Sequence, residues 1–334
     1  LWDRADNIYD FREALRAWST ISTNSLCGDA SGNIALFVAS KVPLRLGNRA
    51  LIMPGDTNLY DWIGFIPFEE LPHGINPPEG ILASANNRSA GADYPYHISH
   101  WYPVPNRYNR ILEMLAEKDI FTLDDMRVMQ ADQNSLWVQK VQAVCWPVLL
   151  KADLQGLALA AFDRVHAWDG HMDKDGIQST LFEVFYQMLK KSVFKDELGE
   201  NYPAYLSGGG AVVMGVMDRI MEGQTIAWCD DINTPEITET IEDLVVPAWS
   251  NAIHWLEENH GKNMEEWIWG DLHMVSLKHP MSSVKLLSRI FNLERGPYRA
   301  GGSSHTVSPF TYSGLRSFSV FHGASQRHVY DLLD

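Results

Sequence analysis

The amino-acid sequence predicts an α+β fold, and three stretches with different hydrophobic patterns indicate this class. Residues 21–42 have the pattern of two strands on either side of a turn. A long central stretch then carries apolar residues at helical spacing, and the strand pattern returns after Pro297. Strands that flank a long helical insertion are typical of a sheet whose neighbouring strands lie far apart in the sequence. We therefore expect one incomplete domain in three segments: a sheet segment at 1–110, a helical insertion at 111–296 and a return to the sheet at 297–334.

The first elements are expected to be a helix and a β-hairpin. The apolar residues of segment 8–18 fall on one helical stripe, and Asn7 is a candidate N-cap. Two apolar runs, residues 21–27 and 33–42, flank the turn-forming residues 29–32 and predict the hairpin.

A loop and a short strand are expected next. Segment 53–78 is rich in Pro, Gly and aromatic residues, which predicts a long ordered loop. Residues 81–85 alternate as a strand would, and the adjacent amides Asn86 and Asn87 follow. Asparagine tolerates turns, but a side-chain amide can also donate to a negative group in a site. The residues alone leave both interpretations open.

The central block is predicted to be helical from Pro105 onward. Thr122 and Asp125 have the spacing of a capping box, and another helix is expected to open at Thr234. The remaining helical patterns cover residues 135–150, 157–166, 177–191 and 212–221. Beyond Pro297, strands are expected at 306–310 and 317–321.

Composition and charge exclude several classes of partner. The 334 residues carry a formal net charge of −15, and the Lys and Arg residues do not cluster. Because phosphate backbones and anionic membranes are bound by clustered cations, we expect neither a nucleic-acid nor a membrane partner. No apolar run has the length of a membrane span. The three cysteines are too few and too scattered for a disulfide framework or a zinc knuckle.

Two groups of residues raise the possibility of a metal site. Segment 168–176 resembles a calcium loop, but the register that aligns its glycine places His171 and Phe182 at the first and twelfth ligand positions. A turn between helices is the favoured interpretation. His273 and His279 lie six residues apart, which suits neither of the common two-histidine motifs, so structural roles are favoured. A metal-dependent hydrolase that uses these histidines with His171, Asp173 and Asp175 remains an alternative.

A series of short motifs also occurs in a particular order along the chain. They are Asp29-Ala30-Ser31-Gly32-Asn33-Ile34, Trp62-Ile63-Gly64-Phe65-Ile66-Pro67-Phe68-Glu69-Glu70-Leu71-Pro72, Asn76-Pro77-Pro78-Glu79-Gly80-Ile81, Ala85-Asn86-Asn87, Asp93-Tyr94-Pro95, Gly270-Asp271-Leu272-His273 and His322-Gly323-Ala324-Ser325. This order resembles the β chain of the penicillin acylase family over nearly the whole sequence. The resemblance implies an amidohydrolase with the αββα sandwich of N-terminal-nucleophile hydrolases.

The resemblance also implies roles for four residues. In this family a serine at the start of the β chain attacks an amide carbonyl, with its own α-amino group as the base. By motif, Asn86 is the side-chain donor to the oxyanion, and Arg107 orients that asparagine. Thr23 and Asn24 fall on the strand that lines the acyl pocket in the family. Asn87 is expected to serve the turn.

The resemblance places the nucleophile outside this sequence. The serine is expected upstream of Leu1, and the sequence does not begin with Met, so we expect an incomplete segment of a β chain. The partner implied is the family α chain, cut from the same precursor or zymogen. Substrates would be N-acyl amides such as penicillins, acyl-homoserine lactones or cyclic lipopeptides. Because proteins of this family are usually exported, the resemblance implies that this protein is periplasmic or secreted. A non-catalytic homologue that only binds such molecules is the second alternative.

No cofactor is expected for catalysis. The family has a structural calcium ion, for which a carboxylate is expected just after Asp93-Tyr94-Pro95. Here Tyr96-His97-Ile98 occupy that position, so we expect any retained calcium ion to depend on residues outside this chain.

Overall fold

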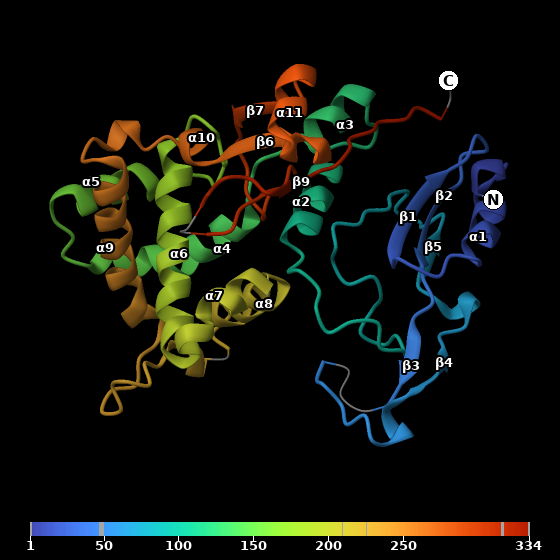
Figure 1. Cartoon of the computed structure of the whole chain (residues 1–334), viewed down its shortest axis with the longest axis horizontal. Helices are drawn as coiled ribbons and strands as arrows, with labels where there is room; N and C mark the ends of the chain where they lie inside the picture. The colour runs from blue at the N-terminus through green and yellow to red at the C-terminus, as the bar shows by residue number, and fades with distance from the viewer. Residues whose placement is uncertain (1, 47–49, 209, 225, 315–316, 333–334) are drawn as a thin grey trace. The chain divides into compact units, whose positions relative to one another are not determined.

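The computed structural model describes residues 2–46, 50–208, 210–224, 226–314 and 317–332. The chain divides into two compact units. One comprises Leu1–Tyr108 with Val329–Asp334, and the other comprises Asn109–His328. Helices and strands occur in both, which confirms the α+β class (Figure 1).

The first unit contains the predicted helix and hairpin. Helix α1 (Ile8–Leu15) begins at Asn7, whose Oδ1 accepts the N–H groups of Tyr9 and Asp10 at 2.9 and 3.0 Å. Strands β1 (Thr23–Gly28) and β2 (Ile34–Ala39) pair antiparallel, as predicted. In the turn between them, Asp29 Oδ1 accepts the N–H of Ser31 at 2.9 Å. Apolar side chains of α1 and β2 form a small core: Ile8, Leu15, Ala35, Phe37 and Ala39.

Two further strands lie within the segment that was predicted to be a loop. β5 (His73–Ile75) pairs with β2, which gives a three-stranded sheet of order β1-β2-β5. β4 (Trp62–Phe65) pairs with β3 (Pro43–Arg45) in a second, two-stranded sheet. Strands of three or four residues between Pro and Gly leave too short a pattern to recognise in the sequence.

The prediction of a strand at residues 81–85 is wrong. No strand of the described part of the chain includes these residues. The N–H of Ala85 instead donates to the side chain of Asn87 at 3.0 Å. Such local side-chain bonds compete with sheet pairing, and small residues add little packing to hold a strand.

Helices dominate the second unit. Helix α2 (Asn106–Leu115) begins in the first unit, and its residues from Asn109 onward belong to the second. The capping box at Thr122 is confirmed, since Asp125 N–H donates to Thr122 Oγ1 and Thr122 N–H to Asp125. The other helices are α3 (Leu123–Gln130), α4 (Leu136–Lys151), α5 (Gly156–Val165), α6 (Ile177–Leu198), α7 (Tyr202–Gly208), α8 (Gly210–Met221), α9 (Ile241–His260), α10 (Trp269–Leu272) and α11 (Lys285–Phe291).

The core of this unit is centred on α6, which packs against α9 and α5 (Figure 1). Its large aromatic side chains meet edge to face. The Trp146 and Trp249 ring centroids lie 6.1 Å apart, and those of Phe185 and Trp249 lie 5.6 Å apart. Such pairs add to the hydrophobic burial that stabilises the bundle.

The helix expected to open at Thr234 begins later. Thr240 caps α9 with a capping box to Asp243. The Thr234 hydroxyl instead donates to Glu239 Oε1 at 2.7 Å, within a turn that precedes the helix. Both sites have a Thr followed by an acidic residue, so the sequence signal did not distinguish them.

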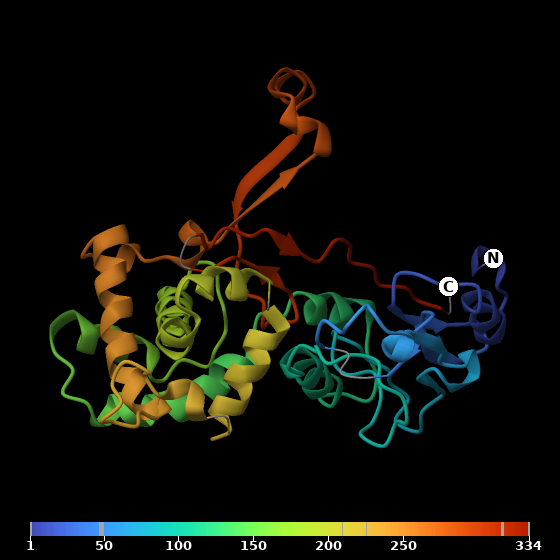
Figure 2. The same cartoon turned by 60° about the horizontal axis from the view of Figure 1, so that its bottom comes forward.

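The strands near the end of the chain differ from the prediction. β8 (Phe310–Thr311) and β9 (His322–Gly323) are shorter and shifted relative to the expected 306–310 and 317–321. A longer pair, β6 (Met274–Lys278) with β7 (Glu294–Arg299), was missed. With α11 between its strands, this pair projects from the helices of its unit (Figure 2). None of the described helices is both long and apolar enough to cross a membrane.

Candidate functional site

The two adjacent asparagines have different roles in the backbone. Asn87 Oδ1 accepts the N–H of Ala85, two residues earlier, and so closes the turn as expected. Asn86 takes a left-handed backbone conformation with a φ of 64°. Because asparagine tolerates this region better than most residues, the sequence can turn sharply here. The Asn86 side chain is exposed at this turn.

Arg107, at the start of α2, holds the Asn86 side chain. Its Nη2 donates to Asn86 Oδ1 at 2.8 Å and to the Ala85 carbonyl at 3.1 Å. A guanidinium has donors only, so the atom facing it must be the amide oxygen. The Asn86 NH₂ group therefore points away from Arg107. No described residue accepts a hydrogen bond from it.

The electrostatics around Asn86 favour negative charge. Burial lowers the pKa of Arg107, although a guanidinium stays protonated at neutral pH. No carboxylate of the described chain forms an ion pair with Arg107. A half-buried cation on the oxygen side of an amide polarises it and makes the NH₂ group a stronger donor.

Asn24, on β1, also reaches this loop. Its Nδ2 donates to Ser84 Oγ at 2.8 Å, and its Oδ1 accepts from Ser89 Oγ at 3.3 Å. Thr23 precedes it on the same strand, so its side chain lies on the opposite face of the sheet. The structure therefore brings Asn24, Asn86 and Arg107 together around residues 84–89, and leaves Thr23 outside the group.

The candidate metal ligands are not brought together. No group of three or more His, Cys, Asp or Glu side chains in the described chain could hold a metal ion. Segment 168–176 connects α5 to α6, as predicted. In it, Asp169 and Asp173 accept the N–H groups of His171 and Asp175 at 2.9 and 3.0 Å. These carboxylates shape turns.

His273 and His279 have structural roles, as predicted. His273 is buried, its Nδ1 lies 2.7 Å from the Phe318 carbonyl, and its ring stacks on Trp269. Burial lowers the pKa of His273 to about 4. His279 Nδ1 accepts the N–H of Met281 at 3.1 Å and so caps a short helical turn.

Helix α6 also carries a buried polar group that was not predicted from the sequence. The Tyr312 hydroxyl donates to Glu183, and Gln187 Nε2 lies 2.7 Å from the same hydroxyl. Burial raises the pKa of Glu183 and lowers that of Lys190 to about 8. The available signal was a Glu and a Gln four residues apart within residues 181–189, a stretch of α6 that is otherwise apolar or aromatic.

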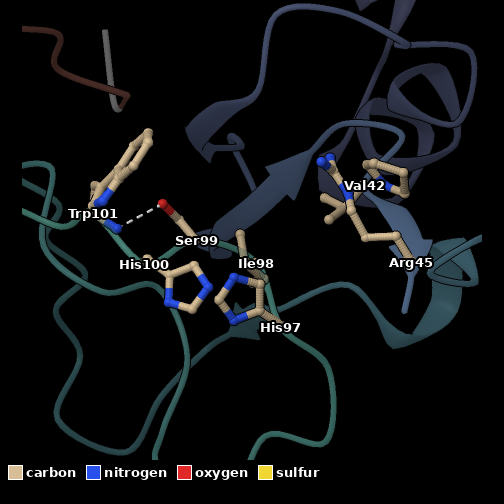
Figure 3. Close-up of a pocket in the computed structure, with 8 residues that line it drawn as sticks. Val42, Arg45, His97, Ile98, Ser99, His100 and Trp101 are labelled. Carbon is tan, nitrogen blue, oxygen red and sulfur yellow. Dashed lines mark hydrogen bonds between the residues drawn. The ribbon is translucent and has the colours of Figure 1, made fainter. Parts of the chain in front are cut away.

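A pocket of about 120 Å³ lies elsewhere in the first unit (Figure 3). Its polar side chains include Arg45, which stacks over the Trp62 ring at 5.4 Å, and His97 and His100, whose ring centroids are 4.1 Å apart. None of the four predicted site residues lines it.

The three residues after Asp93-Tyr94-Pro95 carry no side-chain carboxylate for a calcium ion. The Tyr96 hydroxyl donates a hydrogen bond to the Glu70 carboxylate. Calcium prefers several carboxylate or carbonyl oxygens, and the side chains of Tyr96, His97 and Ile98 supply neither.

Comparison with known proteins identifies relatives along the whole chain. The sequence profile of the family described as penicillin amidase matches residues 1–334. An acyl-homoserine lactone acylase QuiP of Pseudomonas fluorescens (strain Pf0-1) is 26% identical, with 98% of this chain and 41% of that protein covered. The penicillin acylase 2 proenzyme of Pseudomonas sp. (strain SE83) is 27% identical, again over 98% and 41%. The chain thus spans about two fifths of the length of these relatives.

A solved structure shows the same fold. The thermostable penicillin G acylase from Alcaligenes faecalis superposes with a TM-score of 0.61 at 20% sequence identity. The superposition covers 79% of this chain and 51% of that one. This likeness confirms the fold class that the motifs implied.

Proposed function

The chain belongs to the penicillin amidase family, and on that premise we propose that it takes part in the hydrolysis of N-acyl amides. Asn86 is the side-chain donor to the oxyanion in this proposal. The observation that carries it is the 2.8 Å bond from Arg107 to Asn86 Oδ1, which turns the amide NH₂ group outward from the loop. Named acylases among the relatives support the reaction class.

The proposed reaction has two steps. A serine outside these residues attacks the amide carbonyl and gives up its hydroxyl proton to an α-amino group, which titrates near neutrality. The carbonyl oxygen becomes an oxyanion, to which Asn86 Nδ2 donates. The C–N bond then breaks, the amine leaves with a proton, and an acyl-enzyme remains. Water hydrolyses the ester and releases the carboxylic acid.

Arg107 acts through Asn86 in this account. It fixes the amide orientation before the substrate arrives, so no reorganisation is needed as charge develops. Its positive charge also stabilises a negative charge on the far side of the amide. A neutral donor held in this way stabilises the oxyanion more than a donor that rotates freely.

Substrate, partner and location are proposed from the relatives and the family resemblance. Small acyl amides of the penicillin or acyl-homoserine lactone type fit the names of the relatives. The partner would be an α chain from the same precursor, since one relative is named as a proenzyme. We place the protein in the periplasm or outside the cell. No cofactor enters the proposed reaction, and no step depends on calcium.

The test is hydrolysis by the protein as its source gene encodes it, including any sequence outside these 334 residues. Release of amine from an N-acyl amide, strongly reduced in Asn86→Ala, supports the proposal. Stoichiometric binding of the amide without turnover would support the non-catalytic alternative.

A further inference from the structure

The loop that carries Asn86 is held by side chains rather than by a sheet. No described strand includes residues 81–89, so no strand ladder fixes the backbone there. Arg107 bonds the middle of the loop, at Ala85 and Asn86. A loop with few backbone bonds is free to open locally, and a donor on it would then be poorly aimed.

The side-chain amide of Asn24 forms hydrogen bonds with both ends of this loop. Its Nδ2 donates to Ser84 Oγ at 2.8 Å, and its Oδ1 accepts from Ser89 Oγ at 3.3 Å. The two serines lie on either side of Asn86. They are 60 and 65 residues from Asn24 along the chain, so the bonds join distant segments.

The backbone of Asn24 is itself firmly placed. It lies in β1, opposite Val38 of β2, in the sheet that packs against α1. Asn24 therefore connects the three-stranded sheet of the first unit to a loop that is outside the sheet. An amide suits this task because one side chain both donates and accepts.

We propose that Asn24 is a positioning residue that holds the loop 84–89 so that Asn86 meets the developing oxyanion. This inference rests on the proposed role of Asn86. It differs from the role implied by the family resemblance, in which Asn24 lines the acyl pocket. A pocket residue would change which acyl chains bind, whereas a positioning residue changes how well every substrate reacts once bound.

The kinetic test uses Asn24→Ala, Ser84→Ala and the double variant in the full-length protein, with N-acyl amides of several chain lengths. Because each lost hydrogen bond is modest in net terms, we expect kcat to fall about tenfold in Asn24→Ala and about threefold in Ser84→Ala. KM should stay within about twofold for every chain length, and the double variant should lose no more than Asn24→Ala.

Ser22→Ala is the matched control. It removes a 2.8 Å bond between Ser22 and Ser40, close to Asn24 in the same hairpin, without touching the loop. We expect its kcat to match that of the wild type. An equal loss in this variant would overturn the inference, because it would show general damage to the hairpin.

Hydrogen exchange gives a readout that does not depend on turnover. Amides of residues 84–89 should exchange faster in Asn24→Ala than in Ser22→Ala or the wild type. A changed acyl-chain preference with unchanged kcat, or unchanged exchange in the loop, would overturn the inference while Asn86→Ala remained impaired. Full activity in Asn86→Ala would instead overturn the proposed function, and the positioning role with it.

Discussion

Arg107 Nη2 lies 2.8 Å from Asn86 Oδ1, and this bond determines which end of the Asn86 amide is left to donate. The same nitrogen also reaches the Ala85 carbonyl at 3.1 Å, so side chain and backbone are fixed together. A turn with a left-handed asparagine would otherwise leave the amide free to rotate.

Replacing Arg107 should therefore lower the rate of reaction more than the binding of substrate. Arg107→Lys keeps the charge but loses the planar fork, and we expect kcat to fall about tenfold. Arg107→Ala removes both, and a loss of about 10² is expected. Steady-state kinetics of the full-length protein would measure kcat and KM separately.

Arg110→Lys is the control for these variants. Arg110 lies on the same helix but pairs with Asp132 at 3.0 Å and does not contact Asn86. Its kcat should remain close to that of the wild type. Equal effects at Arg107 and Arg110 would show that only the helix start was disturbed.

The buried His273 should make the second unit less stable in mild acid. Its pKa is lowered by burial to about 4 from 6.5, so the unfolded chain takes up a proton first as the pH falls. The free energy of unfolding should then decrease by about 3 kcal/mol between pH 6.5 and pH 4, with no further effect below.

Urea unfolding followed by tryptophan fluorescence would measure this pH dependence. His273→Asn can place an amide N–H near the Phe318 carbonyl without a titrating group. Its stability should vary less with pH over this range than that of the wild type. Parallel curves for the two proteins would contradict the burial argument.

Glu183 should have the opposite pH dependence. Burial raises its pKa above the ordinary value of 4.5, so the unfolded chain loses the proton first as the pH rises. Ionisation therefore lowers the free energy of unfolding above pH 4.5, up to the raised pKa of the folded state. The nearby Lys190 partly offsets this effect.

Glu183→Gln removes the ionisation and keeps an acceptor for Tyr312. We expect its stability relative to the wild type to improve between pH 5 and pH 8, as measured by the urea midpoint. Tyr312→Phe, which removes the donor to Glu183, should lose more stability at pH 8 than at pH 5. A Glu183→Gln effect independent of pH would count against the argument.

Local sequence signals predicted the elements that are stabilised locally. The hairpin of β1 and β2 and the caps at Asn7 and Thr122 rest on residues within a few positions of one another. The β6–β7 pair was missed because its strands carry few alternating apolar residues and include Pro297. The strand expected at 81–85 failed because side-chain bonds replace the sheet pairing there.

The candidate site could be predicted only in part. Ordered motifs singled out Asn86 and Arg107, and the structure places them in contact. The two bonds of Asn24 join residues 60 and 65 positions apart, and no periodicity or spacing indicates such pairs. The hydrogen bond from Tyr312 to Glu183 joins residues 129 positions apart, and no sequence pattern indicates it either.

The most direct test of the central claim is the kcat of Asn86→Ala in the full-length protein with an N-acyl amide substrate. Loss of one oxyanion donor should reduce kcat by about 10² to 10³, with KM little changed and the fold intact by circular dichroism. A variant that folds normally and keeps the wild-type kcat would contradict the role of Asn86 and the account built on it.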